Sequence, residues 1–199
     1  MIDVPRETAE KLKEFADAVA VENERQNLIA RSTIESIDVR HIADSLQLLS
    51  YAPEGGTHWV DIGTGAGFPG LAVALADPRW EMTLVEPRPL RTAFLQAMVE
   101  RFALADRVSV VTGKIEHVQG QADVISARAV AKLGRLFEMA SHLAHPQTRW
   151  LLPKGRQAAA EVAEARTAWT GLIRLEQSET DPDASIVVAE RVERKDRGR

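Results

Sequence analysis

Residues 61–70 read Asp-Ile-Gly-Thr-Gly-Ala-Gly-Phe-Pro-Gly, directly after the apolar pair at 59–60. A helix-compatible stretch follows at 71–76. A strand that turns sharply into a helix needs glycine wherever the backbone and a ligand approach closely. A second apolar segment, 80–85, ends in Glu86, and an acid at this point holds ribose hydroxyls in nucleotide-binding α/β folds. The pattern therefore predicts a ligand-binding loop between the first strand and first helix of an α/β sheet.

Two classes of cofactor compete for this loop. Gly65, Gly67 and Gly70 formally fit the dinucleotide fingerprint. The wider pattern, with Asp61 ahead of Gly63, Gly65 and Gly67, resembles the S-adenosylmethionine loop of Rossmann-like methyltransferases. An acid beside the loop suits a ligand that carries a sulfonium and an ammonium group, whereas it would repel a pyrophosphate. The residues favour adenosylmethionine over a dinucleotide, and a purely structural glycine-rich turn is the remaining interpretation.

The composition limits the class of protein. The chain has 199 residues, 45% of them hydrophobic, which is enough for one core of ordinary size. The absence of cysteine excludes disulfides, Cys-based zinc sites and a Cys nucleophile for methylation at pyrimidine C5. No apolar run approaches the roughly 18 residues of a membrane span, and the N-terminus does not resemble a signal peptide. We therefore expect a cytoplasmic protein without a membrane partner.

The charge distribution bears on nucleic-acid binding. A net charge of −4 weighs mildly against a nucleic-acid partner. The excess of acidic over basic residues, however, lies in residues 1–24, and the tail 191–199 is rich in arginine and lysine. A locally basic face is therefore compatible with a globally acidic chain. A solvated, frayed terminus is the simpler interpretation of the tail.

The chain divides at residue 57. Before it, residues 6–24 predict an amphipathic helix with Leu12, Phe15, Ala16 and Val19 on its apolar face. Ser-Thr-Ile-Glu at 32–35 fits a capping box that opens a second helix, which ends at 53–56. Residues 1–56 are thus expected to form a helical extension, and residues 57–199 one compact catalytic domain.

From residue 57 onward, strands and helices alternate. Strands are expected at 57–62, 80–86, 107–111, 122–126, 148–152, 172–177 and 185–191, and helices at 69–76, 90–104, 114–118, 130–144 and 156–169. Strand–helix alternation predicts a mostly parallel sheet that is covered on both faces. No helix separates the last two strands, so the turn at 181–183 makes them an antiparallel hairpin. A seven-stranded sheet with this hairpin is typical of methyltransferases rather than dinucleotide-binding folds.

Further motifs accompany the glycine loop. They are Asn-Leu-Ile-Ala at 27–30, Arg-His-Ile-Ala-Asp-Ser-Leu at 40–46, Asp-Val-Ile-Ser-Ala-Arg-Ala at 123–129 and Pro-Lys-Gly at 153–155. Together with residues 61–70, they resemble the bacterial small-subunit ribosomal RNA guanine-N7 methyltransferases, also called glucose-inhibited division protein B. The Arg-His-x-x-Asp-Ser-Leu motif and the Gly-Phe-Pro-Gly ending are specific in combination.

The chain departs from this family pattern in the helix after the second strand. The family usually has two adjacent basic residues before Phe-Leu, whereas this chain has Leu90 and Arg91, with Arg88 upstream. Ile29 stands at a position that is Thr in the family, and Lys114 replaces a commoner Arg.

The resemblance implies an α/β, Rossmann-like class I methyltransferase with an N-terminal helical extension. It implies methyl transfer from S-adenosylmethionine to guanine N7 in the decoding-region loop of 16S ribosomal RNA, with the RNA or the 30S subunit as partner of a monomer. The implied cofactor-binding residues are Asp61, Gly63, Gly65, Gly67, Phe68, Glu86, Ile115, Glu116 and Arg128. The implied RNA-binding residues are Arg40, His41, Arg88, Arg91 and Lys154, and we expect Arg40, Arg91, Arg128 and Lys154 to border one positive surface.

The expected catalytic residues are Arg128 and Asp44, which act by positioning. Guanine N7 has an in-plane lone pair and no proton, so it needs no general base. An intrahelical ion pair between Arg40 and Asp44 is the simpler interpretation of their spacing. His41 has no acid, Cys or second His at metal-binding spacing, so we expect no metal site. A methyltransferase for a metabolite or protein, and a non-catalytic adenosylmethionine- or RNA-binding regulator, remain as alternatives.

Overall fold

The computed structural model describes residues 4–195. Residues 1–3 and 196–199, the last of which belong to the basic tail, lie outside the described part. The strands are β1 (His58–Ile62), β2 (Glu81–Glu86), β3 (Val108–Thr112), β4 (Ala122–Ala127), β5 (Ala144–Lys154), β6 (Trp169–Gln177) and β7 (Ser185–Arg194). They form one sheet in the order β3-β2-β1-β4-β5-β7-β6. β1 to β5 pair in parallel, and β7 is antiparallel to both neighbours, so the predicted sheet and hairpin are confirmed.

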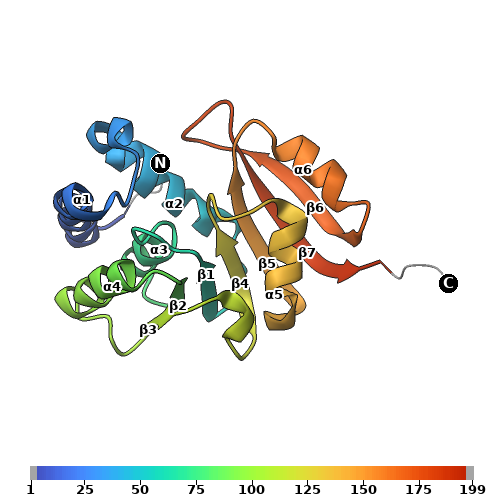
Figure 1. The fold of residues 1–199 in the computed structure, drawn as a ribbon, viewed down its shortest axis with the longest axis horizontal. Coiled ribbons are helices and arrows are strands. Elements are labelled where there is room, and N and C mark those ends of the chain that lie inside the picture. Colours follow the sequence, from blue (N-terminus) through green and yellow to red (C-terminus); the bar gives the residue numbers. More distant parts are fainter. Residues whose placement is uncertain (1–3, 196–199) are drawn as a thin grey trace.

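Helices cover both faces of the sheet. The longer ones are α1 (Arg6–Gln26), α3 (Gly70–Ala76), α4 (Pro89–Arg101), α5 (Leu133–Ala140) and α6 (Ala158–Ala165). One hydrophobic cluster joins α1, α3 and α4 to the sheet, and a second joins α5 and α6 to its other face. Figure 1 shows the same division, with α1, α3 and α4 gathered at one side of the view and α5 and α6 at the other.

The N-terminal helix packs onto the core as its periodicity predicts. Leu12, Phe15, Ala16 and Val19 are all buried in the first cluster. The ring centroid of Phe15 lies 5.2 Å from that of Phe68 in the glycine loop. The extension therefore shares a core with the helices that follow β1 and β2, while its division from residues 57–199 as a domain stays a prediction.

The predicted second helix is not a regular α-helix. Residues 31–51 form a 3₁₀ turn (Arg31–Ser36), a π turn (Asp38–Ala43), one α turn, α2 (Asp44–Leu46), and a second 3₁₀ turn (Gln47–Tyr51). The capping box is wrong, because Ala30 precedes the first turn and no side chain caps it. The hydroxyl of Thr33 instead donates to the Ala30 carbonyl (2.8 Å). π turns are rare and often occur at functional sites.

Further boundaries differ from the prediction. β5 begins at Ala144 rather than at 148. The strand accommodates these residues because its register against β4 shifts between Ala122 and Val124. α5 begins only at Leu133, because Ala129 adopts a left-handed conformation (φ 57°) and residues 129–132 form a loop. The helix expected at 114–118 is a single 3₁₀ turn, Ile115–His117.

Candidate active site

Most glycines of the loop between β1 and α3 lie close to other protein atoms. A Cβ on Gly63 would lie 2.7 Å from a methyl group of Val130, and one on Gly67 would lie 2.8 Å from the Phe15 ring. At Gly65 the nearest atom would be the Arg91 guanidinium at 3.6 Å, and the residue has φ 59°. Packing therefore accounts for Gly63 and Gly67, whereas Gly65 leaves open backbone beside the cavity.

Asp61 holds this loop through hydrogen bonds of its buried carboxylate. Its side chain is fully buried. One carboxylate oxygen accepts from the Gly70 amide (3.0 Å) and the other from the Ser126 hydroxyl (2.7 Å). Burial raises the pKa of Asp61 to about 6, against the opposing effect of these hydrogen bonds. Asp61 fixes the loop to β4 here, and its direct contact with a cofactor stays a prediction.

Glu86, at the end of β2, also binds the glycine loop. Its side chain is nearly buried, with 4% exposed. One carboxylate oxygen accepts from the Gly65 amide (3.1 Å) and the other from the Arg88 amide (3.0 Å). The Arg91 guanidinium lies 3.9 Å away and also donates to the Asn27 carbonyl (3.4 Å). A carboxylate has about four lone-pair positions, so Glu86 retains capacity for two ribose hydroxyls.

A cavity of about 730 Å³ opens beside the loop at the carboxyl ends of the strands, where open α/β sheets bind ligands. It is lined by Leu28, Ile29, Thr33, Arg40, His41, Asp44, Gly63, Thr64, Gly65, Ala66, Phe68, Arg91, Arg128, Ala129, Val130, Ala131, Pro153, Lys154, Gly155, Glu161, Ser178, Thr180, Asp181, Ala184, Ser185 and Ile186. Its volume is that of a typical small-molecule site. The open backbone of Gly65 on its wall, with the Glu86 carboxylate bound to the amide of that residue, fits S-adenosylmethionine.

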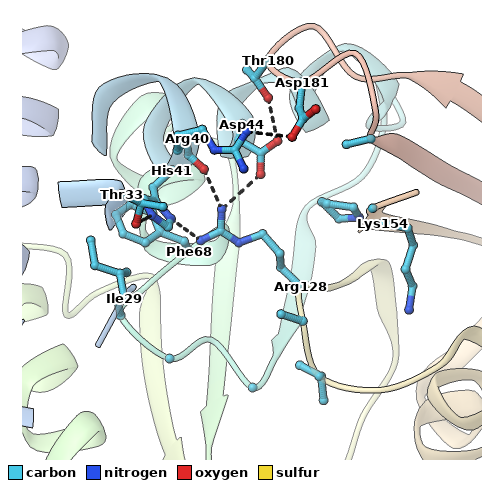
Figure 2. A pocket seen from close by; sticks show the side chains of 18 of the residues that line it. Ile29, Thr33, Arg40, His41, Asp44, Phe68, Arg128, Lys154, Thr180 and Asp181 are labelled. Carbon is cyan, nitrogen blue, oxygen red and sulfur yellow. Dashed lines mark hydrogen bonds and ion pairs between the residues drawn. The ribbon is translucent and has the colours of Figure 1, made fainter. Parts of the chain in front are cut away.

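Arg128, which follows β4, is the centre of the polar contacts in this cavity. One guanidinium nitrogen donates to the Asp44 carboxylate and to the Arg40 carbonyl, both at 3.1 Å. Another lies 2.7 Å from Nδ1 of His41. The guanidinium also lies 5.5 Å from the centre of the Phe68 ring. Figure 2 shows these groups converging on Arg128 from the N-terminal turns and the glycine loop.

The contacts of His41 define its protonation. A guanidinium can only donate, so Nδ1 of His41 accepts from Arg128, and Nε2–H donates to the Thr33 hydroxyl at 2.8 Å. The ring stacks on Phe68 with centroids 5.1 Å apart. Burial, together with the charges of Arg128 and Arg40, lowers the pKa of His41 to about 4. The imidazole is therefore neutral near pH 7, with both nitrogens engaged.

The connection between β6 and β7 completes the cavity. The Thr180 hydroxyl donates to Asp44 (2.9 Å), on the carboxylate oxygen that also accepts from the Gln47 amide (2.8 Å). Asp181 forms an ion pair with Arg40 (2.7 Å). The sequence identified residues 181–183 only as a turn, and Gln47, Thr180 and Asp181 were not predicted as site residues. The sequence around residues 181–183 could not indicate these contacts, because Arg40 and Asp44 lie in the N-terminal turns, far away along the chain.

The predicted RNA-binding residues differ in their surroundings. Arg40, Arg91, Arg128 and Lys154 line the same cavity. Lys154 is held by the Ala131 carbonyl (2.6 Å) and by Glu161 (2.9 Å), and it points away from Arg128 in Figure 2. Each of these cations has a carboxylate partner within 4 Å. Their predicted roles in RNA binding stay predictions.

Six predicted residues do not line the cavity: Asp61, Gly67, Glu86, Arg88, Ile115 and Glu116. Arg88 is exposed just before α4. Ile115 is buried in the 3₁₀ turn after β3, and Glu116 beside it is exposed. Arg135 lies 3.7 Å from Glu116. These positions neighbour the end of β2, because Glu86 pairs in register with Thr112, and their role in adenine binding stays a prediction.

Within residues 4–195, no group of three or more His, Asp or Glu side chains is arranged to hold a metal ion. Over the same residues, no helix is long and apolar enough to cross a membrane.

The neutral state of His41 predicts a pH-dependent contribution to stability. Unfolded His41 should titrate near its ordinary pKa of about 6.5, so the stabilisation from its neutral contacts is present above that pH and is lost as pH falls toward 4. The variant His41→Gln lacks the titrating imidazole, so its unfolding free energy does not contain this pH-dependent part. The stability advantage of the wild type over the variant should therefore shrink between about pH 6.5 and 4.

Urea unfolding at several pH values measures this difference. Asp61, whose pKa shifts in the opposite direction, is present in both proteins and largely cancels in the comparison. Unfolding free energies that change in parallel with pH for the two proteins would contradict the assignment.

Comparison with known proteins bears on the family and the fold of this chain. The model of the family described as rRNA small subunit methyltransferase G matches residues 8–181. A ribosomal RNA small subunit methyltransferase G of Rhizorhabdus wittichii is 48% identical over 197 residues, covering 98% of this chain and 91% of that protein. The protein of the same name from Zymomonas mobilis is 41% identical, covering 94% and 88%.

Solved structures show the same fold. An O-methyltransferase from Bacillus cereus in complex with SAH has a TM-score of 0.62 at 16% identity, covering 91% of this chain and 90% of that one. A mitomycin 7-O-methyltransferase has a TM-score of 0.60 at 19% identity, covering 92% and 67%. The predicted class I methyltransferase fold is confirmed. From these matches and the cavity together, the chain belongs to the rRNA small subunit methyltransferase G family, whose members are S-adenosylmethionine-dependent methyltransferases.

Proposed function

We propose that this enzyme methylates N7 of a guanine in the decoding-region loop of 16S ribosomal RNA. The observation that carries the choice of atom is the state of His41, because its neutral ring donates to Thr33 and accepts from Arg128. A histidine with both nitrogens engaged is not free to remove a proton. Guanine N7 carries a lone pair and no proton, so it can attack without a base.

The carboxylates of the cavity support the same choice. Asp44 accepts from Arg128, Thr180 and Gln47. Asp181 pairs with Arg40, and Glu161 pairs with Lys154. A carboxylate that already accepts hydrogen bonds from several donors has fewer free lone pairs on which to receive a proton. Methylation at an exocyclic amine or an oxygen would require a proton acceptor, which these engaged groups are poorly suited to provide.

S-adenosylmethionine supplies an electrophilic methyl group on its sulfonium. We propose that Gly63, Gly65 and Phe68 hold its methionine portion and that Glu86 holds its ribose. Ile115 and Glu116 are proposed to meet the adenine. Orientation of two reactants in such a site can contribute roughly 7–11 kcal/mol to lowering the barrier.

Arg128 and Asp44 are proposed to act by positioning. Arg128 is fixed on the cavity side by Asp44, His41 and the Arg40 carbonyl, which limits the orientations that its guanidinium can adopt. A guanine in folded RNA must be unstacked or exposed before its N7 can reach the methyl group. Residues of the β6–β7 connection and the N-terminal turns would exclude water around it.

We also propose that the enzyme acts in the cytoplasm, since its substrate is ribosomal RNA, and that it is a monomer. Labelled S-adenosylmethionine, incubated with small ribosomal subunits, with deproteinised 16S RNA or with a metabolite pool, tests the substrate class. Label in RNA, mapped to a guanine, supports the proposal, and label only in small molecules contradicts it. Light scattering of the purified protein tests the oligomeric state.

The absence of a required base predicts a flat pH profile. With saturating cofactor and RNA, the single-turnover rate should change little between about pH 7 and 9, because neither N7 nor a side chain must lose a proton. Quenched-flow measurements of methyl transfer determine this rate. A rate that rises tenfold per pH unit toward a single pKa would exclude the N7 assignment.

A substituted transcript makes the same test independent of pH. When 7-deazaguanosine replaces guanosine, the RNA lacks N7 but keeps its exocyclic amine and oxygen. Transfer should then fall below detection, while the unsubstituted transcript is methylated in parallel. Methylation of the substituted RNA would assign the reaction to another atom.

A further inference from the structure

Two sets of cations can be distinguished by their partners. Arg40, Arg91, Arg128 and Lys154 line the cavity, and each has a carboxylate within 4 Å, from Asp181, Glu86, Asp44 and Glu161 respectively. Within residues 4–195, by contrast, the side chains of Arg31, Arg88, Lys114 and Arg191 are exposed and form no hydrogen bond or ion pair. The second set carries positive charge that no neighbouring acid neutralises.

Arg88 and Lys114 both lie at the carboxyl ends of the parallel strands. Arg88 follows β2 and Lys114 follows β3, each two residues beyond the register pair Glu86 and Thr112. Hydrogen bonds join both segments to Glu86, because its carboxylate accepts from the Arg88 amide and its carbonyl accepts from the Gly113 amide (3.1 Å). Both cations are therefore beside the predicted ribose site, at the carboxyl ends of adjacent parallel strands.

Arg31 joins this region through the N-terminal extension. It opens the 3₁₀ turn, and its neighbours Ile29 and Thr33 line the cavity. The preceding segment is tied to the start of α4, where the Gln26 amide donates to the Leu90 carbonyl (3.2 Å) and Arg91 to the Asn27 carbonyl (3.4 Å). Figure 1 shows the N-terminal turns and α4 on the same side of the sheet.

Arg191 lies elsewhere. β7 runs antiparallel to β5, with Ser185 opposite Lys154 and Glu190 opposite Arg149. A residue beyond Glu190 therefore lies toward the end of the sheet that is opposite the cavity. Arg191 shares the exposure and the unpaired charge of the other cations, but it does not share their location.

We propose that Arg31, Arg88 and Lys114 form the phosphate-binding surface for the substrate RNA, on the Glu86 side of the cavity. The proposal rests on the proposed function, since it presumes RNA as substrate. An unpaired cation gains a full counter-charge from a phosphate and releases the counterions of the RNA. A cation already paired with a carboxylate must first give up that partner, which offsets most of the gain.

This surface assigns different tasks to the two sets of cations. The paired set maintains the shape of the cavity, as in the contact of Arg128 with Asp44 (3.1 Å). The unpaired set attracts the RNA backbone and fixes its register, because phosphate contacts position a nucleic acid without reading its sequence. It also explains how a chain of net charge −4 can bind a polyanion.

The test is the salt dependence of binding to a 16S RNA transcript. Each phosphate contact contributes nearly one unit to the slope of log affinity against log salt concentration. The double variant Arg88→Gln/Lys114→Gln should therefore lower the slope by close to two units, and adding Arg31→Gln should lower it further. Glutamine keeps most of the side-chain length while removing the charge.

Arg191→Gln is the matched control, because it makes the same change in net charge at the opposite edge of the sheet. It should leave the slope at the wild-type value. Melting temperature and S-adenosylmethionine affinity, measured on every variant, show whether a loss of RNA binding comes from unfolding or from damage to the cofactor site. The expected pattern is weakened RNA binding with both of these properties retained.

Two results would overturn the proposal. In one, the double variant keeps the wild-type slope; in the other, Arg191→Gln lowers the slope as much per charge as the proposed residues do. Either result leaves the proposed function intact if the wild-type enzyme still methylates 16S RNA. Failure of the wild type to bind or methylate any ribosomal RNA would instead refute the proposed function itself.

Discussion

Replacement of Glu86 with alanine is expected to weaken S-adenosylmethionine binding by about 10- to 150-fold, or roughly 1.5–3 kcal/mol, the range for hydrogen bonds to a charged group. The carboxylate accepts from the amides of Gly65 and Arg88 and is nearly buried. Its loss removes the proposed ribose contact and also leaves two loop amides without their acceptor. Both effects lower cofactor affinity in the same direction.

Isothermal titration calorimetry of the variant measures this loss. Glu81→Ala is the matched control, because Glu81 is exposed at the other end of the same strand. Glu86→Gln separates the two effects, since the amide oxygen can still accept one hydrogen bond but carries no charge. Wild-type affinity in Glu86→Ala would show that the ribose is bound elsewhere.

Replacement of Arg128 with alanine is expected to slow methyl transfer by about 100-fold, because small misplacement of reacting groups costs this much. Three acceptors would lose their donor together: the Asp44 carboxylate, the Arg40 carbonyl and Nδ1 of His41. Asp44 would keep its hydrogen bonds from Thr180 and Gln47, and His41 would keep its hydrogen bond to Thr33, but Arg128 would no longer fix their positions. The effect should appear in the single-turnover rate at saturating cofactor and RNA.

The effects of related substitutions should be graded. Arg128→Lys keeps the charge but loses the planar fork that contacts several acceptors at once, so its rate should fall between those of the wild type and Arg128→Ala. Arg79→Ala is the control, because Arg79 pairs with Asp77 (2.8 Å) before β2, away from the cavity. An unchanged rate in Arg128→Ala, at wild-type stability, would remove Arg128 from the catalytic site.

Local sequence patterns determined the strands, the glycine loop and the position of Glu86. Alternating apolar and helical segments are local signals, and each predicted strand occurs in the sheet with boundary shifts of a few residues. The loop at 61–70 is predictable for the same reason, because its glycines meet steric requirements within one turn and its immediate neighbours. Family resemblance then supplied Arg128 and Asp44, which residue types alone leave as an unremarkable Arg and Asp.

Only the tertiary structure decided how these residues interact. Arg128 meets Asp44 across 84 residues of chain, and Asp44 meets Thr180 across 136. The spacing of Arg40 and Asp44 suggested an ion pair within one helix, whereas Arg40 pairs with Asp181 and Asp44 with Arg128. The pairing of a charged side chain depends on which elements the sheet order brings together, and periodicity along the chain carries no record of that order. The sequence therefore determined which charges are present, and the fold determined which of them are neutralised.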